Sequence, residues 1–345
     1  MLRTRAGLVA WMAMVGVAAW AGVGEPARGA PATEAADPPA AEKEAGEEAP
    51  SPAADAKEEW RDRVMAAERA FRRRDFARAE VELTAAVKVA EGLKEDTNRL
   101  AVTLGRFVQI YTAQGKYAEA VGPAKRLLQV LEAAHGPRHL NVADALSNLA
   151  GLYMDLGKLD QAKPLLERAL AICADAGGAE RLRAVVLDHL AELHRDGGNL
   201  DAAEPLARES LALRKAQFGD SHRACAKSLE TLGTILLARG DAAEAEKVFR
   251  ESLAIRRMKI GWNRPVIIRS LAHLADACKA QKKYEVAENY YKQAIRMGEG
   301  GLGRNDDVRA EAYEAYADLL RKTDRAAEAE TMAEQARTIR EALEK

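Results

Sequence analysis

The sequence is poor in the residues from which catalytic, metal and disulfide sites are built. Its 345 residues include three cysteines and six histidines, and only 5% of the residues are aromatic. It contains no glycine-rich phosphate loop, no nucleophile elbow and no HExxH zinc motif. We therefore predict that the protein is not an enzyme and that it holds no metal ion and no cofactor.

The chain also lacks a strong excess of either charge. Lysine and arginine together number 52, and aspartate and glutamate number 53, so the formal net charge is −1 at pH 7. Proteins that bind nucleic acid usually carry a marked basic excess on the binding face. We therefore expect no nucleic-acid partner.

Residues 1–24 have the pattern of an export signal. Arg3 and Arg5 precede an uncharged run at residues 7–24, and the small residues of Ala19-Trp20-Ala21 fit a cleavage site. This pattern predicts an exported protein whose body is periplasmic or otherwise extracytoplasmic. The uncharged run is also nearly long enough to span a bilayer, so an uncleaved membrane anchor with the body outside the cytoplasm remains an alternative. We expect membrane contact through this segment alone.

Residues 25–58 resemble a linker. They contain six of the eleven prolines, many alanines and acidic residues, and almost no large apolar side chain. Such a segment buries too little surface to offset the entropy lost on ordering, so we predict a disordered tether. The folded body is then expected at residues 59–345.

The body is built from one short pattern that recurs seven times. In each copy a turn residue is followed by an aromatic residue, leucine or alanine and then by a regularly placed alanine, as in Gly157-Lys158-Leu159 with Ala162. The turn residues are spaced by 41 or 42 residues: Arg74, Gly115, Gly157, Gly198, Gly240, Lys282 and Asp324. A fixed period of this length indicates a stack of supersecondary units.

Each copy encodes two helices. Before the turn, apolar or small residues recur at the i, i+3, i+4, i+7 spacing of one helical face, as in Leu146, Leu149, Ala150 and Tyr153. A second amphipathic segment follows the turn. A glycine column at Gly136, Gly177, Gly219, Gly261 and Gly303 is expected to end the second helices, because glycine accepts the left-handed conformation. We predict fourteen helices in seven antiparallel pairs, stacked as an α-solenoid.

The copies resemble tetratricopeptide repeats of the long, kinesin-light-chain-like kind. The resemblance is carried by LSNLAGLYMDLGKLDQAKPLLERALAI at residues 146–172, by GPRHLNVADAL from Gly136 and by YEVAENYYKQAI from Tyr284. It covers about residues 60–345. It implies an all-α, right-handed solenoid that serves as a non-enzymatic scaffold for protein–protein interaction. In this family the first helices line a concave groove that binds extended peptide segments.

Candidate partner-binding residues follow from that implied geometry. The positions 13, 9, 6 and 2 residues before each turn residue point away from the core stripe of the first helix, so they are expected to line the groove. The mixed charges there predict a protein or peptide partner of mixed or acidic character. The predicted binding residues are Arg106, Asp144, Asn148, His189, Glu192, Lys227, Thr231, Arg269, His273 and Asp276.

The remaining histidines and the cysteines have structural interpretations. His139 and His222 occupy the same repeat position at a helix entry, so we predict helix caps. Cys173, Cys225 and Cys278 are predicted to be buried core residues.

A second function stays open at this stage. A solenoid of this kind also suits a structural or assembly subunit of an envelope or secretion complex, in which the partner is bound permanently. A stable co-purifying partner and large buried patches would favour this alternative.

Overall fold

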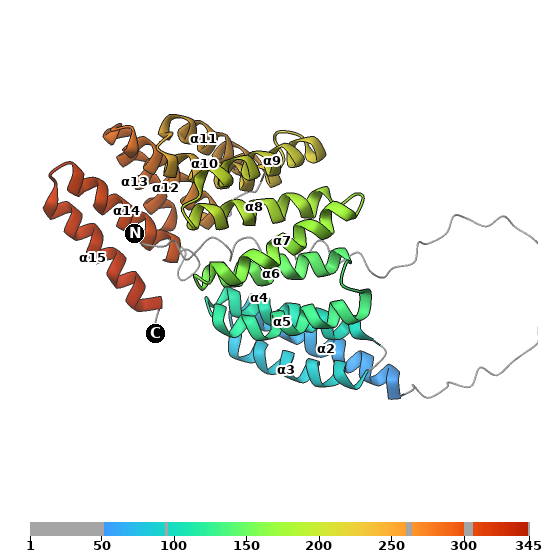
Figure 1. The fold of residues 1–345 in the computed structure, drawn as a ribbon. Coiled ribbons are helices and arrows are strands. Elements are labelled where there is room, and N and C mark those ends of the chain that lie inside the picture. The colour runs from blue at the N-terminus through green and yellow to red at the C-terminus, as the bar shows by residue number, and fades with distance from the viewer. Residues whose placement is uncertain (1–51, 94–95, 260–263, 300–305, 344–345) are drawn as a thin grey trace, which may run out of the picture. The chain divides into compact units, whose positions relative to one another are not determined.

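The computed structural model describes residues 52–93, 96–259, 264–299 and 306–343, and these residues are almost wholly helical (Figure 1). They contain fourteen α-helices and no β-strand. The predicted all-α class and the predicted number of helices are confirmed. The helices are α2 (Pro52–Arg72), α3 (Phe76–Gly92), α4 (Thr97–Ala113), α5 (Tyr117–His135), α6 (Leu140–Asp155), α7 (Leu159–Asp175), α8 (Glu180–Asp196), α9 (Leu200–Phe218), α10 (Arg223–Arg239), α11 (Ala242–Lys259), α12 (Arg264–Ala280), α13 (Tyr284–Gly298), α14 (Asp306–Lys322) and α15 (Ala326–Leu343).

The first helix begins earlier than the sequence pattern indicated. Helix α2 starts at Pro52, inside the segment predicted to be a disordered linker, rather than at residue 59. Proline is tolerated at the first helical position because its missing N–H would have no helical partner there. Alanines and Asp55, an acidic residue in the first turn, then favour helix. The predicted export signal and the rest of the linker lie outside the described residues. None of the described helices is long and apolar enough to cross a membrane.

All seven predicted turn residues have a left-handed backbone. The φ angles of the glycines at 115, 157, 198 and 240 are 72°, 70°, 80° and 94°, and those of Arg74, Lys282 and Asp324 are 62°, 61° and 58°. The amide after the turn residue reaches back to close the preceding helix, as where the N–H of Asp241 donates to the carbonyl of Leu236 at 2.9 Å. The turn column therefore fixes the end of every first helix.

The glycines predicted to end the second helices are described at three repeats. Gly136 and Gly219 have φ angles of 82° and 81°, as expected of helix stops. In the next copy the positive φ, 79°, lies at Gly178 and not at the predicted Gly177. Two adjacent glycines there let the chain turn one residue later. Gly261 and Gly303 lie outside the described residues.

Close helix contact explains the recurring alanine. The alanine that follows each turn is fully buried, with 0% exposure in all seven copies: Ala79, Ala120, Ala162, Ala203, Ala245, Ala287 and Ala329. A related exchange of volumes occurs within one helix pair. A Cβ atom at Gly233 of α10 would lie 2.4 Å from the ring of Phe249 in α11, so glycine leaves the space that this ring fills. The helices of a pair thus approach each other where small residues allow it.

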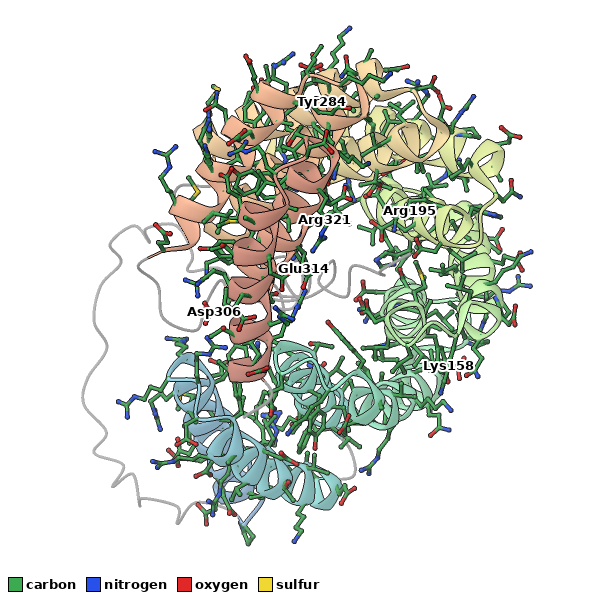
Figure 2. All side chains as sticks on the ribbon, turned by 90° about the vertical axis from the view of Figure 1, so that its left-hand side faces the viewer. Lys158, Arg195, Tyr284, Asp306, Glu314 and Arg321 are labelled. Atoms are coloured by element: carbon green, nitrogen blue, oxygen red, sulfur yellow. The ribbon has the colours of Figure 1, made fainter. Side chains whose placement is uncertain are left out.

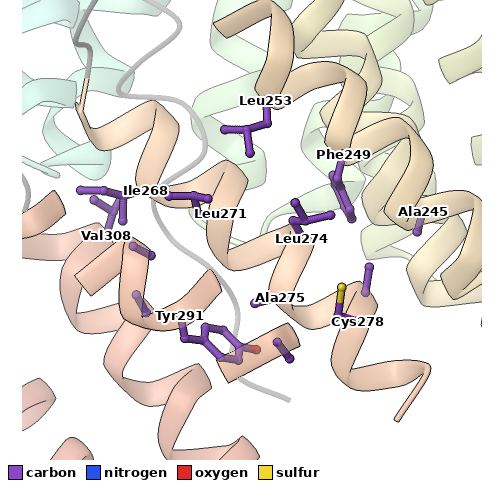
Figure 3. Packing of buried hydrophobic residues seen from close by; sticks show 14 of the residues in the cluster. Ala245, Phe249, Leu253, Ile268, Leu271, Leu274, Ala275, Cys278, Tyr291 and Val308 are labelled. Atoms are coloured by element: carbon purple, nitrogen blue, oxygen red, sulfur yellow. The ribbon is translucent and has the colours of Figure 1, made fainter. Parts of the chain in front are cut away.

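The chain divides into two compact units, which are described separately. The described part of the first unit contains α2, α3 and α4, and its core includes Leu83, Phe107 and Ile110. The described part of the second unit runs from α5 to α15. Figure 3 shows part of its core, where Phe249, Leu274 and Tyr291 come from three successive helices and are almost fully buried. Burying each such side chain contributes about 1.5–3 kcal/mol to folding.

The second unit curves with its first helices on the inner side. Each first helix contacts its own second helix, and α6, α8, α10, α12 and α14 also contact one another in sequence. Successive second helices make no comparably extensive contacts among the described residues. Helices that are closer on one side of a stack give a curved stack. Figure 2 shows Arg195 and Arg321, which end two of the first helices, on this inner side.

Candidate binding surface

Nine of the ten predicted binding residues lie on first helices of the second unit. We call the side of α6, α8, α10, α12 and α14 that carries them the inner surface. It includes Asp144 and Asn148 of α6, His189 and Glu192 of α8, Lys227 and Thr231 of α10, and Arg269, His273 and Asp276 of α12. The tenth residue, Arg106, belongs to α4 in the first unit.

Neighbouring first helices exchange ion pairs across the inner surface. Lys227 of α10 donates to Glu192 of α8 at 2.5 Å, and the Thr231 hydroxyl donates to the same carboxylate at 3.0 Å. Burial acts to raise the pKa of Glu192, but the charges of Lys227 and Arg195 outweigh it and hold this pKa at about 2. Glu192 is therefore ionised at neutral pH and compensated from within the protein.

The cations of α12 are also paired. The Nδ1 atom of His273 lies 2.6 Å from a carboxylate oxygen of Glu230, and Arg269 lies 4.0 Å from Glu311. Asp276 accepts hydrogen bonds from Lys279 at 2.9 Å and from the Tyr291 hydroxyl at 2.6 Å. These contacts satisfy the charges that the sequence pattern assigned to a partner.

Two predicted binding residues are not accessible to a partner in this structure. His189 and Thr231 each have 2% exposure. The Nδ1 atom of His189 lies 2.8 Å from the hydroxyl of Ser147 in the preceding first helix, and burial lowers the pKa of His189. The column position predicted a groove side chain, but the adjacent first helix covers it. We assign these two residues to the contact between repeats.

Two further predicted residues are polar and partly exposed. The Asn148 amide donates to Asp144 at 3.3 Å, and burial raises the pKa of Asp144 to about 6. Arg106 in the first unit forms an ion pair with Glu68 at 2.6 Å. Both residues line a small open cleft of about 180 Å³ on that unit, together with Phe71 and Gln109.

Asp155 is the residue of the inner surface that the sequence analysis did not select. It ends α6, two positions before the turn residue Gly157. Its Oδ2 atom is buried and has no hydrogen-bond partner. Burial, the charge of Glu192 and that of Asp196 raise the pKa of Asp155 to about 7, although Lys227 acts in the opposite direction. No sequence signal marks this residue, because the acids that perturb it come from the next helix pair.

We expect Asp155→Asn to stabilise the protein at pH 8 and much less at pH 5. The folded-state pKa lies above the model value of 3.8, so protonated Asp155 favours folding, and this contribution is lost as the pH rises through about 7. Removing the charge should raise the free energy of unfolding at pH 8 by about 2 kcal/mol more than at pH 5. Chemical denaturation at both pH values measures this difference. An equal effect at both pH values would contradict it.

The other histidines and the cysteines have structural roles. The Nδ1 atoms of His139 and His222 accept hydrogen bonds from the amides of Asn141 and Ala224, at 3.1 and 3.2 Å, so both histidines cap helices as predicted. Cys173, Cys225 and Cys278 are buried free thiols, as predicted. No group of three or more histidine, cysteine or acidic side chains suited to a metal ion occurs among the described residues.

The chain belongs to the tetratricopeptide repeat family. The sequence profile of that family matches residues 99–175, 141–216, 182–258, 224–300 and 266–342. Successive matches begin 41 or 42 residues apart, which is the period of the turn residues. The long, kinesin-light-chain-like form of the repeat is thereby confirmed.

Known proteins are similar to parts of this chain. Nephrocystin-3 from Xenopus laevis is 40% identical over 67 residues, which are 19% of this chain and only 5% of that relative. A putative kinesin light chain from Podospora anserina with nearly identical TPR-like repeats is 23% identical over 59% of this chain and 96% of its own, with a TM-score of 0.49. NprR in complex with its cognate peptide NprX is 16% identical over 81% of this chain and 78% of its own, with a TM-score of 0.58.

Proposed function

We propose that the protein is a non-enzymatic scaffold that binds an extended segment of a partner protein along its inner surface. Membership of the tetratricopeptide repeat family supports interaction with proteins or peptides. The structure of NprR with its cognate peptide has a similar fold and supports a peptide ligand. The pattern of residues 1–24 supports a site of action outside the cytoplasm.

The observation that carries the proposal is the buried, unpartnered carboxyl oxygen of Asp155. The cations nearest to the inner surface are already paired, Lys227 with Glu192 and Arg269 with Glu311. Asp155 lacks such a partner, and its raised pKa shows that its charge is poorly compensated. A lysine or arginine side chain placed beside Asp155 would compensate it. We therefore propose that the partner segment presents a basic side chain here, which differs from the mixed or acidic partner that the sequence pattern suggested.

Bound to such a segment, the scaffold would act through several modest contacts. Asp144, Asn148 and Asp276 are partly exposed along the same helices and offer polar contacts to a backbone or side chain. Exposed charge pairs of this kind contribute about 0–1 kcal/mol each. A buried, charge-assisted contact at Asp155 would contribute more, about 1.5–3 kcal/mol.

The test is to select ligands with the full chain from a phage library of random peptides and to measure a selected peptide by fluorescence anisotropy. We expect selected peptides to be enriched in lysine or arginine and to bind Asp155→Asn at least about tenfold more weakly than the parent. Asp175→Asn is the matched control, since Asp175 also ends a helix and is exposed. Its binding should equal that of the parent.

Two outcomes would contradict the proposal. One is a set of selected peptides without basic residues, and the other is unchanged affinity for Asp155→Asn. Because this substitution is expected to stabilise the fold at pH 8, a weaker affinity there would not result from unfolding. A partner that co-purifies with the chain and does not dissociate would instead favour the structural or assembly subunit.

A further inference from the structure

The junction between the helix pairs α8–α9 and α10–α11 shows how one pair docks on the next. It is held at five polar positions, each contributed by one residue of the first pair and one residue of the second. The pairs are Glu204 with Arg239, Arg208 with Glu244 at 2.7 Å, Arg214 with Ser228 at 2.7 Å, Glu192 with Lys227 at 2.5 Å, and Arg195 with Thr234 at 2.8 Å.

The same positions can be located on the two faces that have no adjoining helix pair in the described chain. One face belongs to α14 and α15, and the repeat register places Glu330, Glu334, Arg340, Asp318 and Arg321 where the first five residues of the junction stand. The other face belongs to α2 and α3, and the register places Arg73, Arg78, Asp62, Arg61 and Glu68 where the second five stand. We call them the α14–α15 face and the α2–α3 face.

The two faces are complementary in charge at all five positions. Glu330 corresponds to Arg73, Glu334 to Arg78, Arg340 to Asp62, Asp318 to Arg61, and Arg321 to Glu68. At the second position the sign is reversed on both sides relative to the internal pair of Arg208 and Glu244, so complementarity is kept without identity of sequence. The Arg73-Arg74-Asp75 turn also repeats the charges of Arg239-Gly240-Asp241, whose first arginine binds Glu204.

These side chains are accessible for such a contact. Arg61, Asp62, Arg73 and Arg78 are exposed on the α2–α3 face. On the other face Glu330 and Glu334 share Arg337 of their own helix, and both carboxylates are more than half exposed. Pairing within the helix does not prevent a second contact, since Glu204 binds Arg208 of its own helix as well as Arg239.

An apolar residue and an uncovered ion pair also distinguish the two faces. Met65 of α2 is 41% exposed, whereas Thr231, which has the same repeat position in α10, is 2% exposed beneath Glu192 of the preceding pair. On the other face Arg340 and Glu314 form an exposed ion pair at 3.2 Å. Its internal counterpart, Arg256 with Glu230, is buried and accepts Ser270 from the next first helix.

We propose that the α14–α15 face of one molecule docks on the α2–α3 face of a second copy of this chain. The contact repeats the internal stacking of helix pairs, so it is heterologous and can continue from copy to copy. Its polar character predicts a weak association that decreases as salt screens the charges. The inner surfaces of successive copies would then follow one another and present several binding sites to one partner.

The test is analytical ultracentrifugation of the full chain over a range of concentrations, with two charge-reversal variants. Arg73→Glu with Arg78→Glu alters one face, and Glu330→Arg with Glu334→Arg alters the other. Each variant alone should associate at least about tenfold more weakly than the parent, because like charges then meet. Mixing the two variants should restore association, since each altered face meets an altered face of opposite charge.

A matched control reverses two exposed lysines elsewhere in the stack, Lys158→Glu with Lys247→Glu, and should associate as the parent does. Thermal unfolding of each variant checks that the fold is intact. A parent that is monomeric at every concentration would overturn the proposal, and the two faces would then be solvated ends. Association that survives the reversals, or that the mixture does not restore, would overturn it as well.

Discussion

Replacing Glu230 by alanine is expected to lower the free energy of unfolding by about 3–5 kcal/mol. Glu230 is 6% exposed and accepts hydrogen bonds from Ser270 at 2.8 Å and Ser252 at 3.1 Å. It also lies 3.4 Å from Arg256 and 2.6 Å from His273. Burial acts to raise the pKa of Glu230, but Arg256 and His273 outweigh it and hold this pKa far below its usual value. Without Glu230 the guanidinium of Arg256 stays buried with no compensating charge.

A double variant separates charge from packing. Glu230→Leu combined with Arg256→Met removes both charges and keeps apolar volume, and it should lose much less stability than Glu230→Ala alone. The two serines tolerate the change because each has a backbone acceptor, Ser252 the carbonyl of Ala226 and Ser270 that of Val266. Urea denaturation followed by circular dichroism measures both variants. Equal losses in the single and the double variant would show that the charge is not what matters.

Ala203→Leu should destabilise the protein by about 1–3 kcal/mol, and Ala162→Leu should do the same. Both alanines have 0% exposure in the column that recurs after every turn. A leucine there would force the two helices of a pair apart, because a close-packed core has no free volume to receive three further carbon atoms. In a stacked array the effect should be largest for the helix pair that carries the change.

Leucines on the exposed side of the same helices provide the control. Ala171 of α7 and Ala212 of α9 are exposed, so Ala171→Leu and Ala212→Leu should leave thermal unfolding nearly unchanged. A comparable loss in the control variants would attribute the effect to leucine itself. Unchanged unfolding of both Ala162→Leu and Ala203→Leu would contradict the close approach of the helices.

The local code of the repeat could be predicted because it acts within a few residues. The residue at each turn adopts the left-handed conformation even where it is Arg74, Lys282 or Asp324, since the helices on both sides determine the turn. The caps at His139 and His222 follow from their position before a helix for the same reason. One position was misjudged, at Gly177, where the following Gly178 has the same conformational freedom.

The candidate site could be predicted only in part. The column spacing identified which first-helix residues point away from their own helix pair, but it did not reveal which of them the next pair covers or neutralises. His189 is covered, and Lys227 is bound by a glutamate 35 residues earlier in the chain. The repeat period is the same for every copy, whereas the charges at a given position differ, so each junction has its own pairs.

The sequence by itself determined the helix pairs, their turns, the buried alanine column and the repeat family, because these depend on backbone conformation, side-chain volume and a fixed period. Only the tertiary structure decided which polar groups are compensated. Glu230 is buried among four partners from three helices, whereas Asp155 keeps one buried oxygen without a partner. Solvation and pairing depend on atoms that stacking brings together from residues about 40 positions apart, and a local pattern carries no information about them.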